Sequence, residues 1–222
     1  MHILPPESID QLLERAYHIA GWQLGELADT LALETPQNFR RHKGWTGQLL
    51  EHWLGASAGS RPEPDFPQLG VELKTIPVDA QGAPLESTYI CVCPLTGLRG
   101  LRWQDSVVFH KLSCVLWIPI QGDRAVPPAQ RHIGMPLLWQ PDPDEMALLQ
   151  RDWEELTEQV ALGRVEQITA HQGEVLQLRP KAANRQVLTD AIGPDGRTIQ
   201  AQPRGFYLRS RFTHRILQKH FL

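Results

Sequence analysis

The stretch of sequence that decides the fold runs from residue 65 to residue 75 and reads DFPQLGVELKT. In a β-strand, successive side chains point to opposite faces, so Glu72 and Lys74 share one face while their apolar neighbours share the other. Asp65 lies a turn upstream, where the chain can fold back and bring its carboxylate beside Glu72. We therefore expect two carboxylates and an ammonium group to converge at one end of a strand, with apolar residues behind them.

Such a convergence suits a hard divalent cation such as Mg²⁺, which prefers oxygen ligands. The cation would polarise a phosphoryl oxygen and activate water, while Lys74 would position that water or offset charge on the phosphate. Glu51, on the edge of a predicted helix, can add a third carboxylate, and Lys111, just before a predicted strand, a second cation. These residues predict a site for phosphoryl chemistry.

The spacing alone leaves other interpretations open. An acidic residue two positions before a lysine on a strand is common, and usually forms a solvated face with a cross-strand salt bridge. A glycosidase also uses two carboxylates, but it needs them to face each other across a sugar, and a lysine beside one has no part in that chemistry.

Helices and strands alternate along the rest of the chain. Apolar spacing and capping signals predict helices over residues 8–20, 24–31, 35–43, 46–54, 144–160, 182–192 and 213–220. Strands are predicted over residues 71–76, 87–93, 113–120, 173–179 and 205–211. This order is typical of a mixed α/β domain with a cleft between lobes. We expect the acidic positions from Asp152 to Glu158 to be solvated.

Composition excludes several classes of protein. Of the 222 residues, 41% are hydrophobic and 21% are charged, which argues against disorder and coiled coil. The longest apolar run is too short to span a membrane, and the first residues lack the pattern of a secretory signal. Three cysteines are too few for a disulfide scaffold. We expect a cytoplasmic protein with no membrane association.

Charge is distributed unevenly along the chain. Residues 1–163 hold 12 Lys and Arg against 21 Asp and Glu, a formal charge of −9. Residues 164–222 hold 10 Lys and Arg against 4 Asp and Glu, a formal charge of +6. A basic C-terminal quarter on an acidic body indicates that one face meets a polyanion, although uneven solvated charge explains the same numbers.

The identities of the residues around this site are more informative than their spacing. The pattern Asp65-x6-Glu72-x-Lys74 resembles the D…ExK signature of the restriction-endonuclease-like nucleases. Nearly the whole chain also resembles the MutH family of DNA mismatch-repair endonucleases. The blocks that carry this resemblance are residues 43–45 (KGW), 54–60 (LGASAGS), 69–77 (LGVELKTIP), 179–184 (RPKAAN) and 203–208 (PRGFYL).

The resemblance implies a restriction-endonuclease-like core sheet flanked by helices, in a single α/β domain over residues 1–222. Two lobes would enclose a DNA-binding cleft, with catalytic residues within about 43–120 and a DNA-reading basic segment within about 164–222. The implied activity is Mg²⁺-dependent nicking of the unmethylated strand of hemimethylated DNA, 5′ to the G of GATC. The enzyme would be a monomer that the MutL ATPase activates after MutS has found a mismatch.

The resemblance also assigns residues. Asp65, Glu72, Glu51 and the backbone carbonyl of Leu73 would hold one or two Mg²⁺ ions. Lys74 would serve the attacking water. The catalytic set would then be Asp65, Glu72, Lys74, Glu51 and Lys111.

DNA would be read mainly by the basic quarter of the chain. Arg179 can pair bidentately with guanine, and the ring of Tyr207 would collide with a methyl group on adenine N6. Without the family, Tyr207 reads as a half-buried strand aromatic. If residues 205–211 form a strand, Arg209 and Arg211 share a face with Tyr207. The full DNA-binding set would be Lys43, Gly44, Tyr89, Arg179, Pro180, Lys181, Tyr207, Arg209 and Arg211.

Two other functions remain as alternatives. A GATC-type restriction endonuclease has a related sequence but cuts both strands. A non-catalytic DNA-binding repair adaptor would suit the basic quarter, since phosphate contacts supply affinity without chemistry. It would not explain why Asp65, Glu72 and Lys74 occur in this order.

Overall fold

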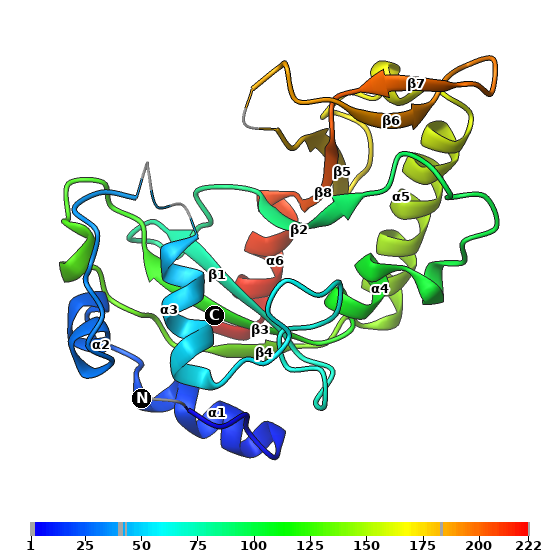
Figure 1. Cartoon of the computed structure of the whole chain (residues 1–222). Coiled ribbons are helices and arrows are strands. Elements are labelled where there is room, and N and C mark those ends of the chain that lie inside the picture. Colours follow the sequence, from blue (N-terminus) through cyan, green and yellow to red (C-terminus); the bar gives the residue numbers. More distant parts are fainter. Residues whose placement is uncertain (1–2, 40–41, 43, 183, 222) are drawn as a thin grey trace. The chain divides into compact units, whose positions relative to one another are not determined.

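The structure is a computed structural model that describes residues 3–39, 42, 44–182 and 184–221 (Figure 1). The chain divides into two compact units. The first unit comprises the described residues up to Glu86, Lys111–Gln140 and those from His214 onward, and the second comprises Ser87–His110 and Pro141–Thr213. Each unit is therefore assembled from separate stretches of the chain.

Three helices open the first unit: α1 (Ile9–His18), α2 (Leu24–Thr30) and α3 (Trp45–Leu54). The side chain of Ser8 accepts a hydrogen bond from the backbone of Gln11, which confirms the predicted start of α1. Helix α3 ends at Gly55, whose φ of 80° is left-handed and where a Cβ would lie 2.5 Å from the carbonyl oxygen of Leu4. The apolar faces of these helices bury against the sheet of this unit.

That sheet has the order β1-β3-β4, formed by β1 (Glu72–Val78), β3 (Val115–Gln121) and β4 (Leu137–Trp139). Strand β1 runs parallel to β3, and β4 runs antiparallel to it. All but the last residue of β3 are buried, as expected of a strand covered on both faces. Strands β1 and β3 confirm the prediction, whereas β4 was not predicted.

The sheet of the second unit is antiparallel and has the order β2-β8-β5. Its strands are β2 (Thr88–Cys93), β8 (Arg204–Leu208) and β5 (Leu176–Pro180). The long helix α5 (Pro143–Ala161) begins with a capping box between Asp142 and Glu145 and matches the predicted acidic helix. A second, two-stranded sheet pairs β6 (Thr189–Ile192) with β7 (Thr198–Ala201).

Two further helices, α4 (Val107–Leu112) and α6 (Ser210–Phe221), each contain a boundary between the units. Short 3₁₀ helices lie at Trp103–Asp105, Pro128–Gln130 and Val165–Gln167. No helix in the described part of the chain is both long and apolar enough to cross a membrane. The mixed α/β class predicted from sequence is confirmed.

Three local predictions were wrong. Residues 184–188 are not helical, and β6 follows because the Gly193–Arg197 segment turns the chain into a hairpin. The described residues between 33 and 39 form no helix, since Phe39 is their only aromatic or aliphatic residue besides Leu33 and no apolar stripe exists to bury. The predicted strand over 205–211 ends at Leu208, and helix α6 begins at Ser210.

Candidate functional site

The first unit gathers the predicted catalytic side chains around the start of β1. Glu72 is the first residue of β1 and is only 1% exposed. The Nζ atom of Lys111, in α4, lies 2.8 Å from Glu72 Oε2 and 3.0 Å from Oε1. The Nζ atom of Lys74, two residues along β1, also donates to Glu72 Oε1. Two ammonium groups therefore neutralise one buried carboxylate.

Asp65 reaches the same strand because the chain folds back on itself. The backbone groups of Phe66 and Val71 hydrogen-bond to each other, and Gly70 adopts a left-handed φ of 64° between them. In this turn, Asp65 Oδ2 accepts a hydrogen bond of 2.9 Å from the backbone N–H of Leu73. The carboxylate is thus fixed beside β1, as the sequence predicted.

Glu51, near the end of α3, completes a group of three interacting carboxylates. Burial raises the pKa of Glu51, and the charges of Asp65 and Glu72 raise it further. Burial likewise raises the pKa of Asp65, followed by the charge of Glu72. Lys74 and Lys111 act in the opposite direction on both carboxyl groups. The local balance is an excess of negative charge that the two lysines only partly offset.

This donor set fits a divalent cation chemically. All three acidic side chains offer oxygen, which Mg²⁺ prefers, and a bound cation would offset the burial and the repulsion that together raise the pKa of Glu51 and Asp65. In the part of the chain that the structure describes, no three acidic, His or Cys side chains already lie at metal-binding distances. Both oxygens of Glu72 accept hydrogen bonds from lysine ammonium groups.

The second unit brings together most of the predicted DNA-binding residues on the β2-β8-β5 sheet. Tyr89 of β2 lies opposite Tyr207 of β8, with ring centroids 5.3 Å apart. The guanidinium carbon of Arg179 lies 5.3 Å from the ring centroid of Tyr207, and the Nζ atom of Lys181 lies 4.0 Å from that of Tyr89. Two tyrosine rings and two cations therefore form one continuous group.

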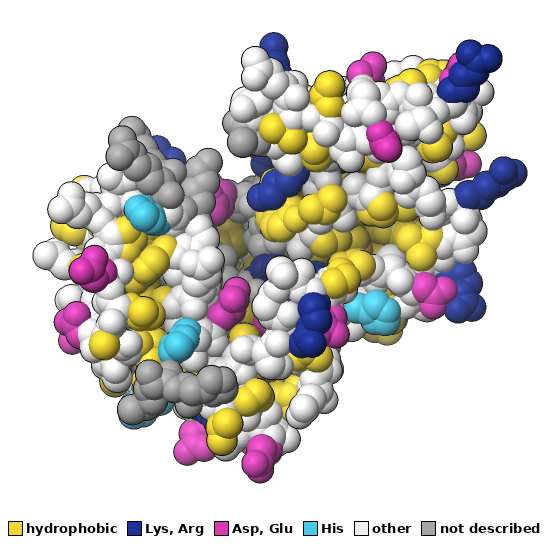
Figure 2. Space-filling view, in the orientation of Figure 1, with side chains coloured by type: hydrophobic (Ala, Val, Ile, Leu, Met, Phe, Trp, Pro, Cys, Tyr) yellow, Lys and Arg dark blue, Asp and Glu magenta, His cyan; other side chains and the backbone are white. Residues whose placement is uncertain are grey.

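Both rings in this group stay neutral at physiological pH. Burial raises the pKa of Tyr89 to about 12. Burial also raises the pKa of Tyr207, although the charge of Arg179 opposes the shift. Arg179, Pro180 and Lys181 are exposed at the end of β5, where they can contact a ligand. In Figure 2, several dark blue Lys and Arg side chains protrude from the unit that holds β5 to β8.

Gly205, which sequence reasoning did not select, lies beneath the two rings. A Cβ atom at this position would meet Tyr89 Cε2 at 2.9 Å and Tyr207 Cε2 at 3.4 Å. Glycine alone therefore leaves room for both rings in their observed positions. The PRGFYL block contains this residue, but its steric role depends on a cross-strand neighbour that the local sequence does not reveal.

The other predicted DNA-binding positions are arranged differently. Gly44 is exposed and lies at the N-terminus of α3, while Lys43 lies outside the described residues. Because β8 ends at Leu208, Arg209 and Arg211 do not share a strand face with Tyr207. Their guanidinium groups instead donate to backbone carbonyls of residues 170–174.

The expectation of a solvated acidic stretch was wrong at one residue. Asp152 of α5 is 1% exposed and accepts hydrogen bonds from the backbone N–H groups of Val175 and Leu176. Glu154, Glu155 and Glu158 are exposed, as expected. Leu149 and Leu156, three residues before and four residues after Asp152, are buried on the same face of α5, so a helical projection is the signal that could have identified it.

Comparisons with known proteins identify relatives of this chain. The family model described as DNA mismatch repair enzyme MutH matches residues 54–152, which include Asp65, Glu72, Lys74 and Lys111. A DNA mismatch repair protein MutH of Shewanella baltica (strain OS185) is 57% identical over 219 residues, covering 99% of this chain and 98% of that protein. The Klebsiella pneumoniae (strain 342) protein of the same name is 59% identical over 218 residues, covering 98% of this chain and 94% of that protein.

Proposed function

The chain belongs to the MutH family of DNA mismatch-repair enzymes, and from this premise we propose that it is the methyl-directed endonuclease. In this proposal it nicks the unmethylated strand of hemimethylated DNA on the 5′ side of the G in GATC. The observation that carries the chemistry is the arrangement at the start of β1. There, Glu72 contacts Lys74 and Lys111 while Asp65 is fixed to the backbone of Leu73.

In the proposed site, Asp65, Glu72, Glu51 and the carbonyl of Leu73 hold a divalent cation, Mg²⁺. When bound, this cation supplies Lewis acidity toward the scissile phosphate and lowers the pKa of a water molecule. Lys74 orients the attacking water and offsets charge on the phosphate, and Lys111 holds Glu72 in place. Burial and neighbouring carboxylates raise the pKa of Asp65 and Glu51, and a bound cation would oppose this shift because it stabilises their ionised forms.

Sequence reading belongs to the second unit in this proposal. Arg179 donates two hydrogen bonds to guanine in the major groove, while Pro180 and Lys181 contact the adjoining phosphate backbone of the DNA. The ring of Tyr207, held between Arg179 and Tyr89, lies against the adenine N6 position and rejects a methyl group there. Gly44, and Lys43 beside it, supply a further DNA contact from the first unit.

The remaining features of the proposal follow from the family. We infer that the MutL ATPase activates the enzyme after MutS has located a mismatch, and that the enzyme acts in the cytoplasm. A monomer suffices, because a single catalytic set cuts a single strand. A GATC-type restriction endonuclease is the alternative, and it would cut both strands.

Nicking of circular duplexes with one GATC site tests the proposal. Unmethylated, hemimethylated and fully methylated circles are incubated with Mg²⁺, with and without MutL, and separated on a gel. We expect nicks only in unmethylated strands, stimulation by MutL and no cutting of the fully methylated circle. Linear product at early times would favour the restriction enzyme, and binding without cutting would favour the adaptor.

A further inference from the structure

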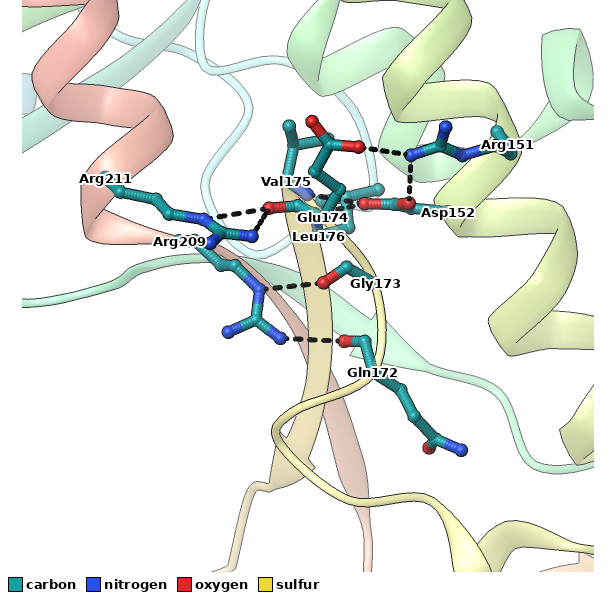
Figure 3. Close-up of polar contacts among 9 residues, drawn as sticks. All are labelled: Arg151, Asp152, Gln172, Gly173, Glu174, Val175, Leu176, Arg209 and Arg211. Atoms are coloured by element: carbon teal, nitrogen blue, oxygen red, sulfur yellow. Dashed lines mark hydrogen bonds and ion pairs between the residues drawn. The ribbon is translucent and has the colours of Figure 1, made fainter.

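Charged side chains hold six backbone groups of one segment in the second unit, residues 170–176 (Figure 3). Arg209 donates through Nη2 to the carbonyl oxygens of Ala170, at 2.8 Å, and Gln172, at 2.9 Å. Its Nε donates to the carbonyl of Gly173 at 3.0 Å. Arg211 donates to the carbonyl of Glu174 through Nη2, at 2.9 Å, and Nε, at 3.3 Å.

The other side of the same segment is held by a carboxylate. Oδ2 of Asp152 accepts hydrogen bonds from the backbone N–H groups of Val175, at 2.6 Å, and Leu176, at 2.9 Å. Arg151, the preceding residue of α5, forms an ion pair of 2.8 Å with the side chain of Glu174 (Figure 3). We name the three residues Asp152, Arg209 and Arg211 the clasp.

The clasp lies where β5 begins and β8 ends. Leu176, the first residue of β5, pairs with Leu208, the last residue of β8. The backbone N–H of Arg209 also donates to the carbonyl of Val175, at 2.9 Å, which extends this pairing by one step. The clasp therefore fixes the end of the β5–β8 ladder at which β5 begins, and with it the direction of β5.

The same ladder carries the proposed reading residues. Arg179 lies three positions along β5 from Leu176 and pairs with Gly205 of β8, while Tyr207 pairs with Gln177. A shift at the start of a short strand is passed to its end, because the hydrogen-bonded register is rigid. A displacement of about 1 Å at a reading side chain is enough to lose a bidentate contact with a base.

We propose that Arg209 is a positioning residue for base reading: it ties residues 170–173 to the end of β8, and its charge does not contact DNA phosphate. The guanidinium group is planar and presents its donors in a fixed fork, which here is used on three carbonyl oxygens. Burial and the nearby charge of Arg211 lower the pKa of Arg209, whereas the charge of Asp152 opposes the shift. This proposal rests on the proposed function, since it assumes that β5 reads GATC.

A phosphate contact and a positioning role respond differently to substitution. A lysine retains the charge and can contact phosphate, but its single ammonium cannot reproduce the three-carbonyl fork. The slope of log binding constant against log salt counts the phosphate contacts, and the loss of one contact reduces it by about one unit. Arg209→Lys and Arg209→Gln therefore separate the two roles.

The experiment measures fluorescence anisotropy of labelled duplexes in EDTA, which prevents cutting, between 50 and 200 mM salt. One duplex contains unmethylated GATC and the other has those four bases reordered. Lys181→Ala serves as the variant that removes a proposed phosphate contact. Arg99→Ala, an exposed loop arginine of the same unit, controls for the general loss of positive charge. Unfolding midpoints confirm that each variant is folded.

We expect Arg209→Lys and Arg209→Gln to lower the preference for GATC about tenfold, within the range that one bidentate contact provides, without changing the salt slope. Lys181→Ala should reduce the slope by about one unit, and Arg99→Ala should leave the preference unchanged. If Arg209→Lys kept the parent's preference for GATC and Arg209→Gln reduced the salt slope, the positioning role would be overturned. If Arg209→Gln does not fold, Arg209→Lys and Arg211→Lys decide the question. A parent protein without preference for GATC would instead overturn the proposed function itself.

Discussion

Glu72 and Asp152 are both carboxylates with 1% exposure, but the two units satisfy them with different kinds of partner. Glu72, in the first unit, accepts hydrogen bonds from the ammonium groups of Lys74 and Lys111. Asp152, in the second unit, accepts two hydrogen bonds from backbone N–H groups at the start of β5. The first carboxylate is held by side chains, whereas the second is held mainly by the main chain, with a longer contact of 3.5 Å to Arg151.

The difference separates a reactive carboxylate from a structural one. The ammonium groups of Lys74 and Lys111 end flexible four-carbon side chains, so their contacts with Glu72 can adjust when a cation or a phosphate arrives. The N–H groups that Asp152 accepts from are fixed by strand pairing and have no such freedom. A buried charge is therefore available for chemistry when its partners can be exchanged.

Removal of an exchangeable partner of Glu72 should have the largest effect on activity. We expect Lys74→Ala to reduce the nicking rate about 10³-fold, because it removes a group that stabilises charge in the transition state. DNA binding and the unfolding midpoint should change little, as Lys111 still contacts Glu72. Arg124→Ala, an exposed turn residue of the same unit, is the matched control. Nicking by Lys74→Ala at close to the parent rate would remove this lysine from the catalytic set.

Substitution of the structural carboxylate should instead affect stability. Asp152→Asn keeps the shape and can still accept both N–H groups through its amide oxygen, but it replaces charge-assisted hydrogen bonds with neutral ones and turns an N–H₂ group toward Arg151, which should lower the free energy of unfolding by about 2 kcal/mol. Urea unfolding measures this directly. Glu155→Gln, an exposed position on the same helix, should change stability by less than about 0.5 kcal/mol. Equal stability losses in the two variants would mean that the hydrogen bonds of Asp152 contribute nothing specific.

Mg²⁺ should distinguish the two carboxylates without any activity assay. A ligand at ten times its dissociation constant stabilises the folded state by about 1.4 kcal/mol, provided that it binds only this state. We expect this increase for the parent and for Asp152→Asn, and no increase for Glu72→Gln. Thermal unfolding with increasing Mg²⁺, compared with EDTA, gives the result. An undiminished response in Glu72→Gln would place the cation elsewhere.

The same comparison shows what sequence can predict. Asp65, Glu72 and Lys74 lie within ten residues, and strand alternation plus one turn is enough to bring them together. Asp152 could not be paired with its partners in this way, because they are backbone groups 23 and 24 residues further along. Main-chain partners leave no side-chain pattern in the sequence.

Errors in element boundaries had related causes. The strand predicted over 205–211 continued an alternation of polar and apolar residues, but Phe212, Ile216 and Leu217 follow at helical spacing and are buried, so α6 starts at Ser210. Strand β6 was mistaken for the end of a helix over 182–192, although Gly193, Pro194 and Gly196 signal a turn directly after it. In the first case, burial of the apolar face of α6 determines where the strand ends. In the second, the turn residues were a signal in the sequence that the prediction overlooked.

Glu51 provides the smallest and most specific test, since its carboxylate repels Asp65 and Glu72. A carboxyl group with a raised pKa in the folded state binds more protons there than in the unfolded chain, so its contribution to stability is lost as pH rises above its ordinary value of 4.5. Glu51→Gln should therefore stabilise the metal-free protein at neutral pH by about 0.5 kcal/mol, the order of a like-charge pair, and lessen the decline with pH. Urea unfolding in EDTA at several pH values measures both effects. A variant less stable than the parent at neutral pH would show that Glu51 supports the fold. The expected gain would show that the metal-free site keeps mutually repelling carboxylates in place, ready for the cation that it binds.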